Sequence, residues 1–102
     1  MKKLEFYVPK PQLEQVLEAL FHAGAGRIGD YDCCCWYTEG QGQFRPLAGS
    51  QPFLGQQDAV HREPEYKVEL VFQAALQPDI IAALKQAHPY ETPAYQVLSI
   101  EL

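Results

Sequence analysis

The sequence has few basic residues and no cluster of them. Lysine and arginine together number 8 against 13 aspartates and glutamates, which gives a formal net charge of -5 at pH 7. The longest basic run is Lys2-Lys3. Nucleic-acid phosphates are bound by clustered positive charge, so this balance argues against a nucleic-acid partner.

Long hydrophobic runs are also missing. No stretch approaches the roughly 20 apolar residues that a membrane-spanning helix needs. The N-terminal segment MKKLEFYVPK begins with basic residues as a signal peptide does, but Glu5, Pro9 and Lys10 interrupt its apolar part. We therefore expect no membrane association and a cytoplasmic location.

Cysteine is scarce, and its three copies are consecutive, at Cys33, Cys34 and Cys35. Neighbouring cysteines with no distant partner exclude a disulfide framework. In an extended strand adjacent side chains point to opposite faces, so three such thiols could not converge on one metal ion. We predict small, buried or half-buried side chains of a strand. A redox or metal role for Cys34 is a minor hypothesis, which unchanged thiol reactivity and metal content after Cys34→Ser would remove.

What the sequence does contain is an ordinary globular composition. The chain has 102 residues, of which 47% are hydrophobic and 21% charged. A chain of this length can bury enough apolar surface to fold without metals or disulfides. We expect one domain that spans residues 1–102.

A strand and a helix are indicated in the first quarter of the chain. Leu4, Phe6 and Val8 alternate with other residues, which predicts a half-buried strand. Between Pro11 and Gly24 the apolar residues recur at helical spacing, and proline suits the first turn of a helix as glycine suits its C-terminal cap. The apolar stripe consists of Leu13, Val16, Leu17, Leu20 and Phe21.

The middle of the chain is less regular. A second strand is predicted at about 31–38, and EGQGQF, residues 39–44, has the composition of a glycine-containing turn. The strand could resume through Phe44 as the arm of a hairpin. Residues 46–64 hold three prolines and two glycines with little periodicity, so we expect an irregular excursion, the kind of long loop that is often functional or intersubunit.

The second half repeats the order strand, helix, strand. Alternation predicts a core strand at 66–72 and a last strand at 95–102, and the helix between them begins at Pro78 and ends before Pro89. Its inward residues should be Ile80, Ile81, Leu84 and Ala87. The order βαβ, irregular insertion, βαβ predicts an α+β fold, the ferredoxin-like βαββαβ plait with both helices on one face of an antiparallel sheet.

The glycines of GAGRIG, residues 24–29, match a dinucleotide-binding pattern by spacing. In a nucleotide site such glycines follow a strand and open a helix, so that the phosphates meet the positive helix N-terminus. Here they follow the predicted helix, whose C-terminal end is partly negative. We interpret them as a helix cap and a tight turn, and a nucleotide titration that raised the melting temperature would contradict this.

HPYETPAY, residues 88–95, admits two interpretations. His88 and Glu91 are residue types that bind first-row metals, and His61, Glu63 or His22 could complete a site. Alternatively, a histidine in the last helical turn satisfies free carbonyls and the acid accepts backbone hydrogen bonds. The structural interpretation is favoured, because two ligands make only half a site. Unchanged metal affinity after His88→Ala would remove the metal hypothesis.

Catalysis has little support in the residue pattern. No Ser/His/Asp arrangement or nucleophile elbow is present, and no spacing points to paired carboxylates. The aromatic residues, among them Trp36 and Phe53, are expected to fill the core and interfaces.

Several stretches taken together resemble a known family. AGAGRIGDYDCCCWYTEGQGQFRPLAGSQPFLG, EYKVEL and AHPYETPAYQV are similar to the domain inserted into YqfO-type members of the NGG-interacting-factor-three-like family. The likeness covers essentially the whole chain. The residues to which it gives a structural role are Gly24, Gly26, Gly29, Gly40, Gly42, Phe44, Pro46, Gly49, Pro52, Gly55, Pro89, Tyr90 and Tyr95.

This resemblance implies a PII-like or CutA-like version of the plait, which in CutA proteins assembles as trimers through sheet edges. It also implies a homo-oligomer, trimer or dimer, that senses a ligand or contacts a protein. The larger family's metal ligands lie in domains flanking the insert, so no enzyme activity and no firm cofactor are expected here. The alternative is a divalent-metal protein of CutA-like type that uses His88 and Glu91, completed by His61 or Glu63 across an interface.

Overall fold

The computed structural model describes residues 1–102. Its strands and helices are β1 (Lys2–Pro9), α1 (Leu13–His22), β2 (Trp36–Phe44), β3 (His61–Phe72), α2 (Gln77–Ala87) and β4 (Tyr95–Ser99). A single 3-10 turn leads into each helix, η1 (Lys10–Gln12) before α1 and η2 (Ala74–Leu76) before α2. Neither helix is long and apolar enough to cross a bilayer.

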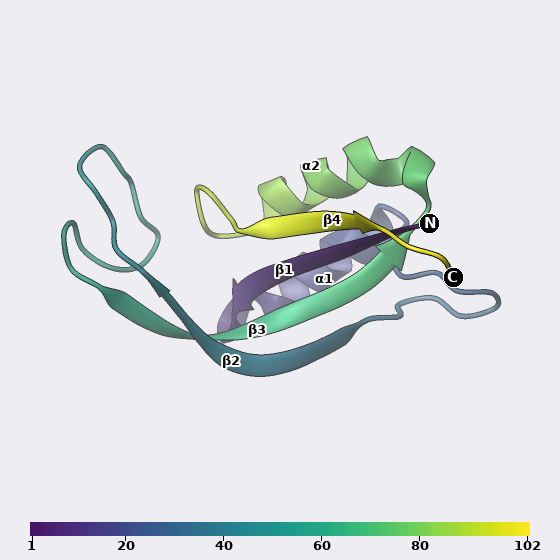
Figure 1. The fold of residues 1–102 in the computed structure, drawn as a ribbon, viewed down its shortest axis with the longest axis horizontal. Helices are drawn as coiled ribbons and strands as arrows, with labels where there is room; N and C mark the ends of the chain where they lie inside the picture. The colour runs from purple at the N-terminus through teal and green to yellow at the C-terminus, as the bar shows by residue number, and fades with distance from the viewer.

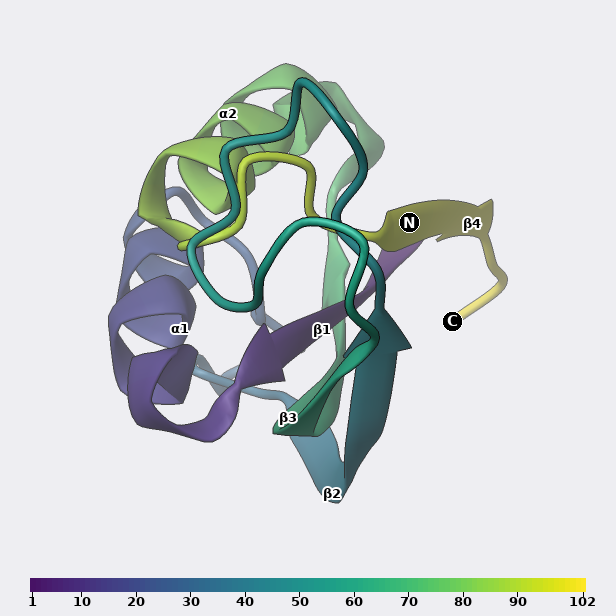
Figure 2. The same ribbon diagram turned by 90° about the vertical axis from the view of Figure 1, so that its left-hand side faces the viewer.

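The four strands form one antiparallel sheet in the order β2-β3-β1-β4. Both helices lie on one side of it, as Figures 1 and 2 show. The predicted α+β plait is therefore confirmed. The β2–β3 hairpin extends beyond the helices (Figure 1), so its far half is covered by neither of them.

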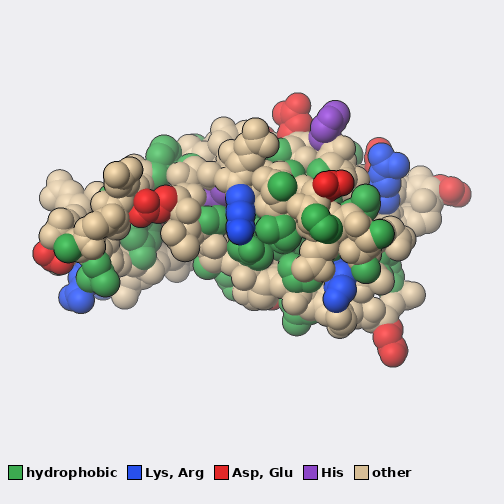
Figure 3. Space-filling view, turned by 90° about the horizontal axis from the view of Figure 1, so that it is seen from above, with side chains coloured by type: hydrophobic (Ala, Val, Ile, Leu, Met, Phe, Trp, Pro, Cys, Tyr) green, Lys and Arg blue, Asp and Glu red, His purple; other side chains and the backbone are tan.

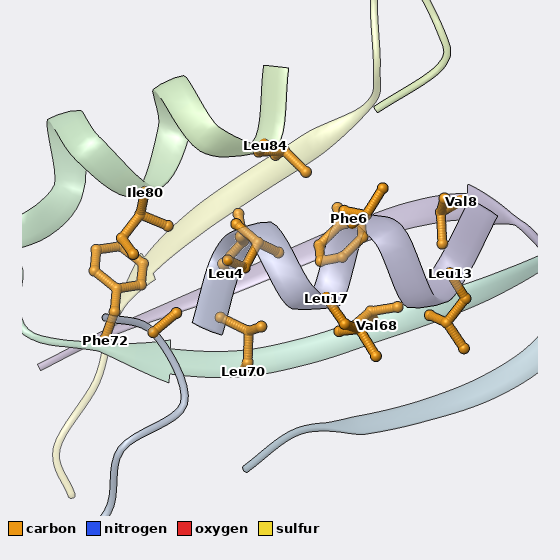
Figure 4. Packing of buried hydrophobic residues seen from close by; sticks show 13 residues of the cluster. Leu4, Phe6, Val8, Leu13, Leu17, Val68, Leu70, Phe72, Ile80 and Leu84 are labelled. Carbon is orange, nitrogen blue, oxygen red and sulfur yellow. The ribbon is translucent and has the colours of Figure 1, made fainter. Parts of the chain in front are cut away.

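The core lies between the sheet and the two helices (Figure 4). The alternating residues of β1 and β3 face it, as predicted, together with the apolar stripes of the helices. Its 13 buried members are Leu4, Phe6, Val8, Leu13, Val16, Leu17, Leu20, Ala25, Val68, Leu70, Phe72, Ile80 and Leu84. Burying one such large side chain fully contributes about 1.5–3 kcal/mol relative to exposing it, so this cluster is the main source of stability.

The end of α1 has the hydrogen-bond pattern of a Schellman cap. The Ala25 N–H donates to the Leu20 carbonyl at 3.0 Å, and the Gly24 N–H donates to the Phe21 carbonyl at 3.1 Å. Gly24 has φ +107, a value that residues with a Cβ rarely adopt. Gly26 then hydrogen-bonds through its N–H to the Val71 carbonyl at 2.8 Å. The glycines at the start of GAGRIG thus close a helix and return the chain to the sheet.

The predicted second strand is wrong in its position. Residues 31–35 are irregular, and β2 begins only at Trp36. The predicted turn at 39–44 is also wrong, because these residues continue β2 to its end. Nine residue pairs with β3, from Trp36↔Glu69 to Phe44↔His61, override the turn preference of the two glycines, as strand pairing often overrides local propensity. The predicted hairpin is present.

The irregular excursion is shorter than predicted. β3 begins at His61, so residues 61–64 belong to a strand, and the connecting loop comprises only 45–60. Pro64 fits within β3 because the pairing with β1 stops at Pro9↔Glu65. Beyond that pair β3 has a neighbour on one side only, which is where a strand accepts a proline. At the other end of the chain β4 stops at Ser99 rather than at residue 102.

The prediction that the three cysteines lie in a strand is wrong, because they precede β2. Cys33 is exposed and has the left-handed φ of 54. Cys34 and Cys35 are half-buried, in line with the predicted burial. Burial raises the pKa of the Cys35 thiol, followed by the effect of its two neighbouring thiols. A raised pKa keeps a thiol protonated and less reactive.

Candidate functional site

His88 ends α2 at the point where the chain turns toward β4. Its side chain is only 5% exposed. Its Nδ1 accepts a hydrogen bond from the Tyr90 N–H at 3.1 Å, and its Nε2 lies 2.6 Å from the Tyr7 carbonyl. Because Nδ1 accepts, the proton must be on Nε2, which donates to that carbonyl. His88 is therefore a neutral imidazole with both nitrogens engaged.

The position of Tyr7 explains why an imidazole is needed there. The last pair between β1 and β4 is Phe6↔Tyr95, so Tyr7 lies one residue beyond the reach of β4. A buried carbonyl without a partner is strongly unfavourable. The His88 side chain supplies the hydrogen bond that β4 does not reach far enough to make. Pro89 prevents α2 from continuing past His88.

Tyr90 links the turn between α2 and β4, residues 88–94, which we call the corner, to the β2–β3 hairpin. Its hydroxyl donates to Glu65 Oε2 at 2.6 Å, and Glu65 is only 9% exposed. Burial raises the pKa of Tyr90, and the neighbouring Glu65 carboxylate raises it further. On the neighbouring strand β2, a Cβ on Gly42 would overlap the Glu65 carboxylate. Gly42 therefore leaves the space in which the carboxylate lies.

Aromatic rings fill the region between the two predicted histidine ligands. The Phe44 ring centroid lies 5.2 Å from that of His61 and 5.5 Å from that of Tyr90. The Tyr90 ring in turn lies 5.1 Å from that of His88. Phe44 and Tyr90 thus stand between His61 and His88, which belong to opposite ends of this row of rings.

Glu91 is exposed and ties the hairpin loop to the corner. Its Oε1 accepts a hydrogen bond from the backbone N–H of Gln51 at 3.0 Å. Figure 2 shows loop 45–60 in front of the segment that joins α2 to β4. A cleft of about 170 Å³, lined in part by Pro52, Phe53 and Thr92, separates the two segments. Glu91 therefore has a structural partner within the chain.

The predicted metal ligands come together only in part. His61 Nε2 and Glu63 Oε1 lie 2.7 Å apart on β3. His88 is held elsewhere, and His22 is exposed on α1. No group of three His, Cys, Asp or Glu side chains is placed to hold a metal ion within one chain. A divalent-metal site built from these residues stays a prediction, and it needs ligands from a second chain.

The other residues singled out by the resemblance lie in four places. Gly24, Gly26 and Gly29 lie between α1 and β2; Gly40, Gly42 and Phe44 lie in β2; Pro46, Gly49, Pro52 and Gly55 lie in loop 45–60; Pro89, Tyr90 and Tyr95 lie in and after the corner. Sequence reasoning missed Glu65 and Tyr7, which complete the corner. Their signal is the strand register, which a single sequence does not reveal.

Solved structures with the same arrangement of elements identify the fold. CutA1 from Pyrococcus horikoshii superposes with a TM-score of 0.71 at 16% identity, over 99% of this chain and 84% of that one. CutA from Synechococcus elongatus PCC7942 superposes with a TM-score of 0.68 at 22% identity, over 97% of this chain and 75% of that one. The fold is CutA-like. Likeness at these identities concerns the fold alone.

The CutA-like chain also matches one segment of larger bacterial proteins. A Bacillus cereus protein related to NIF3 superposes with a TM-score of 0.84 at 38% identity, over 99% of this chain and 26% of that one. The GTP cyclohydrolase 1 type 2 homolog of Bacillus subtilis (strain 168) is 43% identical over 101 residues, 99% of this chain and 27% of that protein. No family model matches the chain.

The homologue from Listeria monocytogenes, which has the same name, is 44% identical over 101 residues, 98% of this chain and 27% of that protein. The CutA-like chain thus spans about a quarter of the length of the curated relatives that it matches. This agrees with the predicted likeness to one domain of a larger protein. The activities of those whole proteins do not follow from this quarter.

The buried imidazole of this CutA-like corner should make stability depend on pH. Burial lowers the pKa of His88 below its ordinary value of 6.5, so the unfolded chain binds a proton more readily than the folded one. The contribution of neutral His88 to the stability of the folded chain is therefore fully present above pH 6.5. It is lost as the pH falls through 6.5 toward the pKa of His88 in the folded chain. The loss should approach about 1.4 kcal/mol for each pH unit in that window.

Urea unfolding at about pH 7.5 and about pH 5.5 measures this dependence. The drop in the free energy of unfolding between the two pH values should be smaller in His88→Gln, which has no titratable group at this position. It should be unchanged in His22→Gln, because the His22 side chain is exposed. Equal drops in the unmodified chain and in His88→Gln would contradict the assignment.

Proposed function

We propose that this chain is a self-associating, non-enzymatic domain of the cytoplasm that senses a ligand or contacts a protein through its assembled form. The observation that carries the proposal is the open edge of β2. Seven of the nine residues of this strand are exposed, and β3 is its only neighbour in the sheet. A long edge strand with free N–H and C=O groups is a template for pairing with another chain.

Exposed aromatic side chains strengthen the case for β2 as the contact. Trp36 is 59% exposed and Tyr37 43% exposed. Both lie at the start of this edge strand, where an added chain would cover them. Tryptophan and tyrosine are enriched at the centres of protein interfaces.

The sheet face away from the helices is a poorer contact surface near Lys3, Glu5 and Glu69, because these charged side chains already have partners. Lys3 forms ion pairs with Glu69 and, at 3.2 Å, with Glu5, and the Gln96 amide donates to Glu5 at 2.7 Å. The contacts with Glu69 and Glu5 raise the pKa of Lys3, and the hydrogen bonds from Gln96 and Lys3 lower that of Glu5. Burying such a satisfied polar network against another face would add little.

The face shown in Figure 3 offers no strong field of one charge to a partner. On the face shown in Figure 3, acidic and basic side chains are scattered among hydrophobic and uncharged ones. Association through β2 needs no such field, because backbone pairing and aromatic burial provide the attraction. At the corner, His88 and Tyr90 form hydrogen bonds within the chain, so we assign neither residue a catalytic role.

A charge placed on the β2 edge should weaken the assembly. In Trp36→Lys, the buried aromatic contact is lost and a lysine is introduced at the edge, so the association constant should fall at least about tenfold. Size-exclusion chromatography with light scattering at micromolar concentrations measures the mass of the assembly.

Tyr31→Lys is the matched control, since Tyr31 is 76% exposed but lies outside β2. It should leave the mass unchanged. A monomeric unmodified chain, or an assembly that Trp36→Lys does not weaken, would contradict the proposal.

A further inference from the structure

Two adjoining cavities lie on the sheet face opposite the core, where the β2–β3 hairpin leaves the body. Their volumes are about 340 Å³ and 160 Å³. Both are lined by Tyr7, Gln41, Gly42 and Glu65. The larger also contacts Tyr90 of the corner. None of the functions considered above uses this space.

Glu65 gives the cavities a carboxylate that forms no ion pair. The side chain is only 9% exposed, and none of the ion pairs in the structure includes it. Its Oε2 accepts the hydrogen bond from Tyr90, whereas Oε1 accepts none. Every fully buried side-chain oxygen in the structure has a hydrogen-bond partner. Because Oε1 has none, it must be accessible from the cavity. A carboxylate that is nine-tenths buried normally has a cationic partner.

The walls of the cavities suit a flat cation. Phe44 and Tyr90 are among the aromatic residues that line the larger cavity. Gly40 and Gly42, which have no side chains, line the strand beside Glu65. Lys67 lines the smaller cavity, and its ammonium group is in none of the ion pairs. The larger cavity thus offers a carboxylate and aromatic rings, and the smaller one offers the same carboxylate and a lysine that forms no ion pair.

We propose that these cavities bind a small zwitterion with a guanidinium group, the chemistry of arginine. The guanidinium pairs with Glu65 and stacks on the aromatic wall, and the carboxylate of the same molecule is received by Lys67. A guanidinium is planar, presents several donors to one carboxylate and stacks on aromatic faces. A metal ion would find only one carboxylate there, too few ligands for a stable site. The proposal does not depend on self-association through β2.

Titration calorimetry of the full chain with three related molecules tests the chemistry. Arginine should bind with one molecule per subunit. Citrulline, in which a neutral urea group replaces the guanidinium, should bind at least about tenfold more weakly, because a charge-assisted hydrogen bond is lost. Agmatine, which retains the guanidinium but lacks the carboxylate, should bind more weakly than arginine and equally to the unmodified chain and to Lys67→Ala.

Variants assign the binding to Glu65. Glu65→Gln retains an oxygen that accepts from Tyr90 but removes the charge, and it should weaken arginine binding at least about tenfold. Glu63→Gln is the matched control, since Glu63 lies on the same strand and pairs with His61 instead. Tyr90→Phe, which leaves the carboxylate charged, should retain binding. Melting curves of each variant confirm that it is folded.

The mass of the assembly, measured with and without arginine, distinguishes the two sources of a guanidinium. An unchanged mass indicates that a free small molecule is the occupant. A mass that falls on adding arginine indicates that the side chain of a second copy occupies the cavities. No arginine binding at millimolar concentrations, equal binding of citrulline, or unweakened binding by folded Glu65→Gln would overturn the proposal.

Discussion

Replacing His88 with alanine should lower the free energy of unfolding by about 2–4 kcal/mol. The substitution removes a buried ring and leaves the Tyr7 carbonyl, to which Nε2 donates, without a partner. It also removes the acceptor of the Tyr90 N–H. Leaving a buried acceptor without a partner lowers the free energy of unfolding by about 1–3 kcal/mol. The cavity left by the ring lowers it further.

Urea unfolding of His88→Ala and His22→Ala at neutral pH compares a buried histidine with an exposed one on the same scale. His22 lies on the exposed side of α1, and its loss should change stability by no more than about 0.5 kcal/mol. If the two substitutions have equally small effects, then His88 is not the structural corner described above.

Replacing Gly42 with alanine should lower the free energy of unfolding by about 2 kcal/mol or more. The new Cβ would overlap the Glu65 carboxylate, which must move and thereby lose its hydrogen bond from Tyr90. Gly40, two residues earlier in β2, has no atom within 4 Å of the position of a Cβ. Gly40→Ala should therefore change stability little or raise it slightly, because alanine fits a strand better than glycine.

A double-mutant cycle shows whether Glu65 is the cause. In a Glu65→Ala chain the carboxylate is absent, so adding Gly42→Ala should have much less effect than in the unmodified chain. Equal penalties for Gly40→Ala and Gly42→Ala, or a penalty that persists without the Glu65 carboxylate, would contradict this explanation.

The periodic part of the fold could be predicted from the sequence. The alternation of Leu4, Phe6 and Val8, and the helical stripe of α1, each bury one face of an element, so pattern and structure agree. The hairpin could be predicted only in part. The composition of residues 39–44 is that of a turn, and only the pairing with β3 makes them a strand.

The corner was predictable as a structural element but not in its contacts. Pro89 after a helix, with His88 before it, indicates a helix end from local sequence alone. The partner of His88 lies 81 residues away, and that of Tyr90 lies 25 residues away. Such pairs depend on the sheet register, which local patterns do not contain. The position of the cysteines was mispredicted for the same reason, because the start of β2 is set by pairing.

Native mass spectrometry of the chain, purified without chelator and sprayed from micromolar solution, tests the central claim that this is a self-associating domain. One spectrum reports both the number of subunits and any molecule retained in the assembly. We expect a mass near a whole multiple, two or more, of the 11.5 kDa chain. A single species at 11.5 kDa would contradict the account.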